Sequence, residues 1–243
     1  MKPTVILVHG AYAESSTWNG ILPSLRAAGH PVIAFATPLR SPAADAALLS
    51  ALVRSIEGPV VLVGHSYGGA VITNVDAGST PVAGLVYVAG FALEAGESCV
   101  DASGLVPGST LAETLTRVPT ADGGFDTYIA PERYHQQFAA DLSAETAELM
   151  AITQRPVTEA GLGEPSGQNP LWRTVPSWFL YGELDRNIPA GAHAIMAERA
   201  GARRSVVVPG ASHVVGVSHP DQTAALVLEA ADSPALTDAR AGH

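Results

Sequence analysis

The feature that most constrains this chain is a serine held between glycines, directly after an unbroken apolar run. Residues 60–63 are all apolar and mostly β-branched, and Gly64-His65-Ser66-Tyr67-Gly68 follows them. Such a run predicts a strand buried on both faces of a parallel sheet. With a helix after it, the G-x-S-x-G pattern predicts a tight strand-to-helix turn that exposes the serine hydroxyl. This context favours Ser66 as a nucleophile over an incidental serine, because the helix N-terminus stabilises developing negative charge beside it.

Short β-rich runs alternate with helical patterns along much of the 243 residues. Strands are expected at 4–8, 32–35, 60–63, 82–88, 177–181 and 205–208. Helices are expected from Ser16 or Thr17 to Gly29, and over 42–56, 67–77 and 221–231. This alternation predicts an α/β fold with a mainly parallel sheet of about six strands, flanked by helices.

Residues 94–173 break this alternation. They contain no convincing strand pattern, but helical patterns occur at 131–140 and 143–154. We therefore expect a helical lid, inserted after the fourth strand, between two parts of an α/β core at 1–93 and 174–232. Residues 233–243 are small and polar, so we expect a flexible tail there.

A second motif, His9-Gly10-Ala11-Tyr12, directly follows the first expected strand. A glycine-rich turn at this place presents a backbone N–H to an oxyanion, and the second N–H comes from the residue after the nucleophile. The sequence thus predicts Ala11 and Tyr67 as the two oxyanion donors.

The chain has eight histidines. His9 and His65 belong to the two turns and are expected to hold the turn backbone. His213 follows the last expected strand, where a loop carries it over the carboxyl edge of the sheet, and it is favoured as the general base. His219 precedes Pro220 and reads as a loop or cap residue. Four histidines have no pattern and are expected at the surface: His30, His135, His193 and His243.

The partner acid is sought on the loop after the strand at 177–181. That loop carries two carboxylates, Glu183 and Asp185. The order serine, acid, histidine along the chain fits this arrangement. Asp185 lies deeper in the loop and is the better candidate, whereas Glu183 is expected to be solvated. Glu94, after the fourth strand, is an outside alternative.

These motifs together resemble the α/β-hydrolase superfamily over almost the whole chain. They particularly resemble the small esterase branch that includes plant methyl-ester esterases and hydroxynitrile lyases. The resemblance implies serine hydrolase chemistry without a metal or a cofactor. The stretches that carry it are Leu7-Val-His-Gly-Ala11, Gly64-His-Ser-Tyr-Gly68, Gly182-Glu-Leu-Asp185, Ser212-His213 and Ser218-His-Pro220.

The function expected from these residues is hydrolysis of a carboxylic ester or lactone through an acyl-enzyme, with Ser66, Asp185 and His213 as the catalytic residues. Two alternatives stay open: another reaction of the same fold, such as cyanohydrin cleavage or cofactor-free peroxide chemistry, and a hydrolase-like binding or signalling protein. In the lyases that the chain resembles, a threonine follows the oxyanion-strand histidine and a lysine follows the catalytic histidine. Here Gly10 and Val214 stand at those positions, which favours ester cleavage.

Aromatic residues of the lid and the oxyanion loop are expected to line the substrate pocket. Phe138 and Met150 are instead expected in the core of the lid. Arg186 is the only Arg or Lys beside the catalytic motifs, and it could equally face solvent, so the expected substrate is neutral and largely apolar. The expected substrate-binding residues are Tyr12, Trp18, Phe125, Tyr128, Tyr134 and Trp172.

The formal net charge of −10 argues against a nucleic-acid partner and against anionic membranes. The single cysteine, Cys99, excludes an intrachain disulfide and fits a reducing compartment. The apolar run at 4–8 is too short for a secretion signal or a membrane span. We therefore expect a cytoplasmic protein that binds a small ester or lactone, and the sequence leaves a homodimer open.

Overall fold

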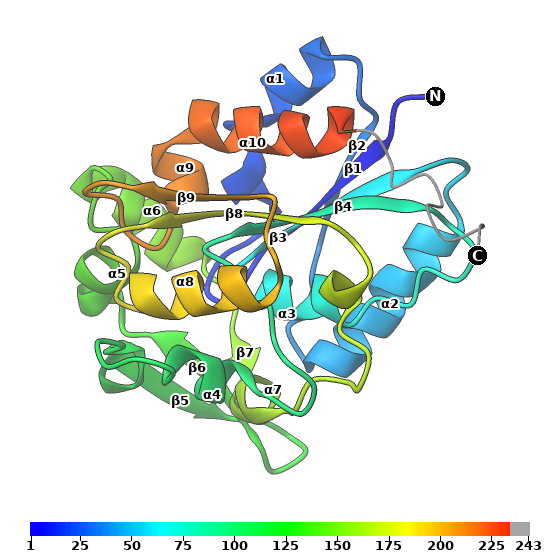
Figure 1. Cartoon of the computed structure of the whole chain (residues 1–243). Helices are drawn as coiled ribbons and strands as arrows, with labels where there is room; N and C mark the ends of the chain where they lie inside the picture. The colour runs from blue at the N-terminus through cyan, green and yellow to red at the C-terminus, as the bar shows by residue number, and fades with distance from the viewer. Residues whose placement is uncertain (234–243) are drawn as a thin grey trace.

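A six-stranded, wholly parallel sheet forms the centre of the protein (Figure 1). The structure is a computed structural model and describes residues 1–233. The expected tail at 233–243 therefore lies outside the described residues, apart from Ser233. The strand order is β2-β1-β3-β4-β8-β9. The strands are β1 (Thr4–Val8), β2 (Val32–Phe35), β3 (Val60–His65), β4 (Val82–Val88), β8 (Ser177–Gly182) and β9 (Arg204–Val208). All six strands expected from the sequence are confirmed.

Helices cover both faces of this sheet, as Figure 1 shows. One layer contains α1 (Leu22–Ala27), α9 (Val215–Ser218) and α10 (Pro220–Asp232), and the other contains α2 (Pro42–Arg54), α3 (Tyr67–Thr73) and α8 (Ala190–Arg199). A 3-10 turn, Ser15–Trp18, precedes α1. Two capping signals act as expected: the Ser41 hydroxyl accepts a hydrogen bond from the Ala44 N–H, and Gly29 has a φ of +81° beyond the end of α1. The expected start of a helix at Ser16 or Thr17 is wrong, because α1 begins at Leu22 without a side-chain cap. The helix after Ser66 ends at Thr73 and is thus shorter than the helix expected over 67–77.

The strand order has a switch point between β1 and β3. From β1 the chain crosses to β2 on one side, and it then returns to β3 on the other side. The loops that leave β1 and β3 therefore diverge, and in open α/β sheets the crevice between such loops binds ligands. The pairing of Val8 with Gly64 brings the turn at His9 next to Ser66.

The insertion between β4 and β8 contains the two helices expected there, but it also contains strands that the sequence pattern did not show. It contains a three-stranded antiparallel sheet in the order β5-β6-β7. The sequence pattern missed β5 because that strand is mostly exposed and mixes polar with apolar residues. Asp122-Gly123, with a φ of +86° at the glycine, lies in the turn before β6 and is a hairpin signal. The strands are β5 (Leu115–Pro119), β6 (Phe125–Ile129) and β7 (Val157–Thr158), and the helices are α4 (Cys99–Ser103), α5 (Pro131–Phe138), α6 (Ala144–Thr153) and α7 (Glu159–Gly163), with 3-10 turns at Leu111–Thr114 and Leu171–Arg173.

The two ends of this insertion lie together. The indole N–H of Trp172 donates a hydrogen bond of 2.9 Å to the carbonyl of Leu93. Arg173 forms an ion pair with Glu94 beside that bond. The chain thus leaves the core and re-enters it at one place.

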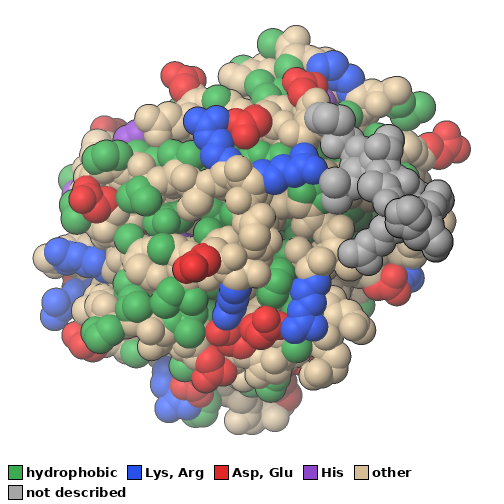
Figure 2. Space-filling view, in the orientation of Figure 1, with side chains coloured by type: hydrophobic (Ala, Val, Ile, Leu, Met, Phe, Trp, Pro, Cys, Tyr) green, Lys and Arg blue, Asp and Glu red, His purple; other side chains and the backbone are tan. Residues whose placement is uncertain are grey.

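Charged side chains of both signs are interspersed on the face shown in Figure 2. Several of them form ion pairs, such as Arg199 with Glu97 and Arg204 with Glu229. Within residues 1–233, no helix combines the length and the apolar character that a bilayer span requires.

Candidate active site

Ser66 occupies a strained turn between β3 and α3. Its φ of 53° and ψ of −122° are rarely adopted by residues other than glycine. The glycines around it are required by close packing. A Cβ on Gly64 would lie 2.5 Å from the Gly68 carbonyl oxygen, and one on Gly68 would lie 2.3 Å from the Val8 carbonyl oxygen. The turn therefore holds the Ser66 side chain at the carboxyl end of β3.

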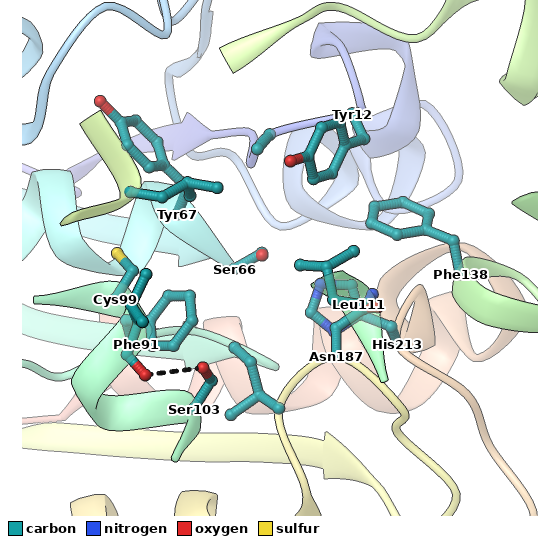
Figure 3. Close-up of a pocket in the computed structure, with 14 residues that line it drawn as sticks. Tyr12, Ser66, Tyr67, Phe91, Cys99, Ser103, Leu111, Phe138, Asn187 and His213 are labelled. Carbon is teal, nitrogen blue, oxygen red and sulfur yellow. Dashed lines mark hydrogen bonds between the residues drawn. The ribbon is translucent and has the colours of Figure 1, made fainter. Parts of the chain in front are cut away.

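Two backbone N–H groups beside Ser66 have no acceptor. Neither the N–H of Ala11 nor that of Tyr67 donates a hydrogen bond within residues 1–233. By contrast, the next N–H of the oxyanion loop, that of Tyr12, donates to the Arg155 carbonyl. Ala11 and Tyr67 both line the cavity that contains Ser66 (Figure 3). These are the two groups that the sequence predicts as oxyanion donors.

His213 and Asp185 meet across the loops that follow β9 and β8. His213 Nδ1 lies 2.7 Å from Asp185 Oδ2, and both side chains are buried. The loops approach so closely that a Cβ on Gly182 would lie 2.3 Å from the Ser212 carbonyl oxygen. The other carboxylate oxygen of Asp185 accepts hydrogen bonds from the N–H groups of Asn187 and Ile188.

This environment keeps Asp185 ionised. Burial alone would raise the pKa of the Asp185 carboxyl. The neighbouring His213 and the hydrogen bonds from two histidines outweigh burial and hold that pKa below its usual range. An ionised Asp185 fixes His213 with its proton on Nδ1, which leaves Nε2 as an acceptor. That Nε2 is buried and has no partner within residues 1–233, and His213 lines the same cavity as Ser66.

The alternative acids and the alternative base lie elsewhere. Glu183 is exposed and accepts a hydrogen bond from the Gly210 N–H. Glu94 forms its ion pair with Arg173. His219 contacts the Ser218 hydroxyl and is not among the residues that line the cavity. Of these carboxylates, only Asp185 contacts His213.

His193 was expected at the surface, and that expectation is wrong. It is fully buried, and its Nε2 lies 3.3 Å from Asp185 Oδ2, the oxygen that His213 also uses. Its ring stacks on Tyr181 with 4.8 Å between the centroids. Burial lowers its pKa, so the ring is neutral at neutral pH. A sequence signal existed, because His193 shares one helical face with the buried Met196 and Ala197 of α8.

The other histidines expected at the surface differ in their burial. His30 is buried, and its Nδ1 contacts the Pro3 carbonyl, so it too was wrongly expected at the surface. His135 is half-buried, with its Nε2 3.0 Å from the Leu142 carbonyl oxygen. His243 lies outside the described residues.

His9 and His65 hold turn backbone, as the sequence predicts. His9 Nε2 accepts a hydrogen bond from the Thr37 N–H, so its Nδ1–H donates to the Gly10 carbonyl. His65 Nε2 donates to the His213 carbonyl at 3.2 Å. Burial lowers the pKa of His9 to about 4 and that of His65 to about 3. Both are therefore neutral structural links around Ser66.

The cavity at Ser66 is lined mostly by apolar side chains, and Figure 3 shows its labelled residues. Phe138, expected in the lid core, contributes to the lining, whereas Met150 is not part of it. The lining residues are Ala11, Tyr12, Ser66, Tyr67, Phe91, Cys99, Val100, Ser103, Leu111, Phe138, Leu162, Asn187, Ile188 and His213.

Of the six aromatic residues expected to bind substrate, only Tyr12 lines this cavity. Trp18 packs edge-on against His65 and is not part of the lining. Trp172 ties the ends of the insertion together, and the Tyr134 hydroxyl donates to the Tyr12 carbonyl at 2.7 Å. The remaining two lie half-buried on β6, where the Arg117 guanidinium covers the ring of Phe125 and Tyr128 follows three residues later. Their polar or cationic contacts hold most of these rings in the framework, away from the cavity.

A parallel α/β sheet with a serine elbow, a buried histidine–aspartate pair and a cavity between them defines a hydrolase-type fold and site. Comparison with known families agrees: residues 5–226 match the family model described as "Alpha/beta hydrolase family". The chain therefore belongs to the alpha/beta hydrolase family.

Individual relatives are more distant. The "Carbendazim hydrolyzing esterase" of Nocardioides sp. (strain SG-4G) is 36% identical over 109 residues, which are 38% of this chain and 44% of that esterase. The chain thus matches less than half the length of that relative. The crystal structure of polyneuridine aldehyde esterase has a TM-score of 0.80 at 19% identity, covering 96% of this chain and 100% of the other. A pyrethroid hydrolase from Sphingobium faniae JZ-2 has a TM-score of 0.73 at 20% identity, covering 96% and 98%. At these identities the two structures support the fold alone.

Proposed function

We propose that the protein is a serine esterase that cleaves a small, neutral, largely apolar carboxylic ester or lactone. One observation carries the proposal: Asp185 holds His213 by Nδ1 and leaves its Nε2 without a partner, and His213 lines the same cavity as Ser66. A neutral imidazole with a free Nε2, oriented by an ionised carboxylate, is the form that a general base requires.

The proposed reaction follows from these positions. Ser66 Oγ attacks the ester carbonyl carbon while His213 Nε2 takes the hydroxyl proton. The N–H groups of Ala11 and Tyr67 stabilise the oxyanion. The tetrahedral intermediate collapses, the carbon–oxygen bond to the alcohol breaks, and His213 returns the proton to the departing oxygen. Water then attacks the acyl-enzyme with His213 again as base, which releases the acid and restores Ser66.

The cavity supports a neutral substrate. Its lining is mostly apolar, and it contains no Lys or Arg among the described residues. Arg186, the one cation beside the acid, is exposed. Two of the similar proteins are named as esterases and one as a pyrethroid hydrolase, which fits ester cleavage.

The geometry gives no support to hydroxynitrile lyase chemistry. A Cβ on Gly10 would lie 2.7 Å from the Ser66 Cβ, so a threonine at this place would force a shift of the turn. Val214, where the lyases carry a lysine, is buried. Hence neither of the lyase-type residues has a counterpart here. Cleavage of mandelonitrile faster than of esters, dependent on Ser66, would contradict this reading.

The test of the proposed function uses Ser66→Ala. Wild-type protein should be labelled by a fluorophosphonate and should hydrolyse p-nitrophenyl acetate, butyrate, hexanoate and octanoate, with kcat/KM rising until the cavity is full. Ser66→Ala should lose labelling and reduce turnover on the order of 10⁴-fold, because the members of such a triad act as a unit. Persistent labelling at another serine, or preference for a substrate with a free carboxylate, would overturn the proposal.

A further inference from the structure

Asn187 places an unused hydrogen-bond donor in the wall of the Ser66 cavity. The residue lines this cavity and is 3% exposed. Its side-chain Nδ2 is buried and has no acceptor within residues 1–233. Buried amide groups are nearly always paired, so this one calls for an explanation.

The orientation of the Asn187 amide is fixed by its neighbours. Gln137 Nε2 donates to the Arg186 carbonyl, which can only accept, and this sets the orientation of the Gln137 amide. In that orientation the Thr110 hydroxyl donates to Gln137 Oε1. Gln137 Nε2 also donates to Asn187 Oδ1 at 2.7 Å. A flipped Asn187 would place its own NH₂ group against Gln137 Nε2, donor against donor, so Nδ2 is the atom that lacks a partner.

Among the side chains of this cavity wall, one other buried nitrogen lacks a partner within residues 1–233, and the proposed reaction gives it a role. It is His213 Nε2, which the proposed reaction uses for proton transfer. By the same reasoning, a site that leaves an N–H unpaired when empty pairs it with an acceptor of its ligand, and it discriminates against ligands that lack that acceptor.

The position of Asn187 indicates which half of an ester it meets. Its backbone N–H bonds to Asp185, which holds His213. Gln137, its side-chain partner, is followed by Phe138, whose ring lies 4.9 Å from that of His213. In the view of Figure 3, Asn187, His213 and Phe138 lie on one side of Ser66, and Cys99 and Ser103 lie on the other. The leaving oxygen must be within reach of His213, so the alcohol half of the ester lies on the Asn187 side.

We propose that Asn187 Nδ2 forms a subsite for a hydrogen-bond acceptor in the alcohol half of the substrate, such as an ether or carbonyl oxygen beyond the scissile ester. This inference rests on the proposed esterase function. It narrows the substrate class from apolar esters in general to esters of alcohols that carry a second, neutral oxygen.

The test compares esters that differ by one oxygen in place of one methylene. The alcohol pair is n-pentyl butyrate and 2-ethoxyethyl butyrate, and the acid pair is ethyl hexanoate and ethyl 3-ethoxypropanoate. Hydrolysis is followed by proton release, and the ratio of kcat/KM, ether over hydrocarbon, is taken within each pair. Wild type should give a ratio of about one or more for the alcohol pair, because the hydrogen bond offsets the burial of the ether oxygen. Asn187→Ala should lower that ratio about five- to tenfold and leave the acid-pair ratio unchanged.

Ser103→Ala is the matched control. Ser103 also presents a polar group at the cavity, but its hydroxyl already donates to the Val100 carbonyl at 2.9 Å. Its loss should therefore leave both ratios unchanged. A ratio within one variant is insensitive to a general loss of activity, and Asn187→Leu serves if Asn187→Ala does not fold.

Several outcomes would overturn the subsite. A wild-type alcohol-pair ratio tenfold or more below one would show that no donor meets the ether. An equal loss for both esters in Asn187→Ala would make the residue merely structural, and an effect confined to the acid pair would contradict the alcohol assignment. If no ester is cleaved, the esterase proposal fails by itself. Binding of the two alcohol-pair esters to Ser66→Ala, measured by calorimetry, then still tests whether Asn187 binds the ether oxygen. Equal Kd values for the two esters would exclude the subsite.

Discussion

His213 is fixed at both its ring and its backbone. Asp185 holds the ring at Nδ1, and His65 donates a hydrogen bond to the His213 carbonyl. His219, only six residues later, has neither contact and lies outside the cavity lining. A base needs a fixed ring and access to the nucleophile, and among these two histidines only His213 has both.

This difference makes a paired prediction. His213→Ala should reduce kcat/KM for p-nitrophenyl butyrate on the order of 10⁴-fold, as severely as the loss of Ser66, because the groups act together. His219→Ala should retain most of the turnover. The measurement is steady-state kinetics on proteins whose folding is verified by circular dichroism. If the two variants exchanged these results, the assignment of the base would be wrong.

His193 gives the acid a second imidazole neighbour. Asp185 Oδ2 is shared between His213 at 2.7 Å and His193 at 3.3 Å. His193 does not line the cavity, so it cannot touch a substrate there. We therefore assign it as a positioning residue, which restrains the Asp185 carboxylate and acts on the chemistry only through it.

Substitution of His193 should thus affect kcat and spare KM. His193→Leu removes a donor to a carboxylate and should lower kcat about tenfold. His193→Gln can still donate through its amide and should recover most of the loss, which a purely space-filling role would not predict. Equal kinetics for the Leu and Gln variants, or a change mainly in KM, would argue against positioning.

At the scale of elements, the insertion positions the oxyanion loop. Tyr12 has a φ of 59°, and three groups of the insertion hold it there. Its N–H donates to the Arg155 carbonyl, its carbonyl accepts from the Tyr134 hydroxyl, and its own hydroxyl contacts Thr127. Ala11, with its free N–H, is the preceding residue, so the geometry of this proposed oxyanion donor depends on the insertion.

Tyr134→Phe tests this dependence. Loss of its hydrogen bond should destabilise the protein by about 1 kcal/mol and lower kcat a few-fold, because the loop at Ala11 becomes less ordered. Tyr128→Phe is the control, since Tyr128 of β6 is half-buried and its hydroxyl forms no hydrogen bond within residues 1–233. The measurements are thermal unfolding and steady-state kinetics. Unchanged kcat in Tyr134→Phe would show that the loop keeps its geometry without this contact.

The core could be predicted from the sequence because its signals are local. Continuous apolar runs mark the six strands, and the elbow needs glycines at fixed positions. The helices of the insertion follow their expected patterns, but its strands could not be predicted. They are short, β5 is mostly exposed, and β6 is stabilised by a partner distant in the sequence, as where the Thr127 hydroxyl donates to the Val157 carbonyl. The aromatic residues that line the cavity could not be predicted for a similar reason. An aromatic side chain such as Trp172 or Tyr134 reveals its apolar character in sequence but not the acceptor that its N–H or O–H finds.

At the scale of the whole molecule, buried neutral histidines link folding to pH. His9, with a pKa of about 4, and His65, with a pKa of about 3, titrate near 6.5 when unfolded. Between these values the unfolded chain binds more protons than the folded one, so stability decreases as pH falls. Asp185 has a lowered pKa as well, and its contribution is lost only below the usual carboxyl range.

The melting temperature should therefore decrease as pH is lowered from about 6.5 to 4. His9 alone accounts for about 3 kcal/mol over this range, from its shift of roughly 2.5 units. His9→Asn should be less stable at pH 8 but should show a shallower decrease with acid. Thermal unfolding at constant ionic strength measures both slopes. Parallel slopes for wild type and variant would mean that His9 does not titrate as described.

The junction between Trp172 and Leu93 also bears on how such enzymes diversify. The insertion leaves and re-enters the core at one hydrogen-bonded place. Recombination that exchanges the insertion between related genes therefore needs only two junctions, and these lie next to each other in the folded protein. A new cap can then bring a new substrate range to an unchanged catalytic core. The contacts of Tyr12 limit this freedom, since a foreign cap without counterparts of Tyr134 and Arg155 would leave the oxyanion loop unsupported. We therefore expect functional chimaeras to be those in which the cap and the oxyanion loop come from the same parent.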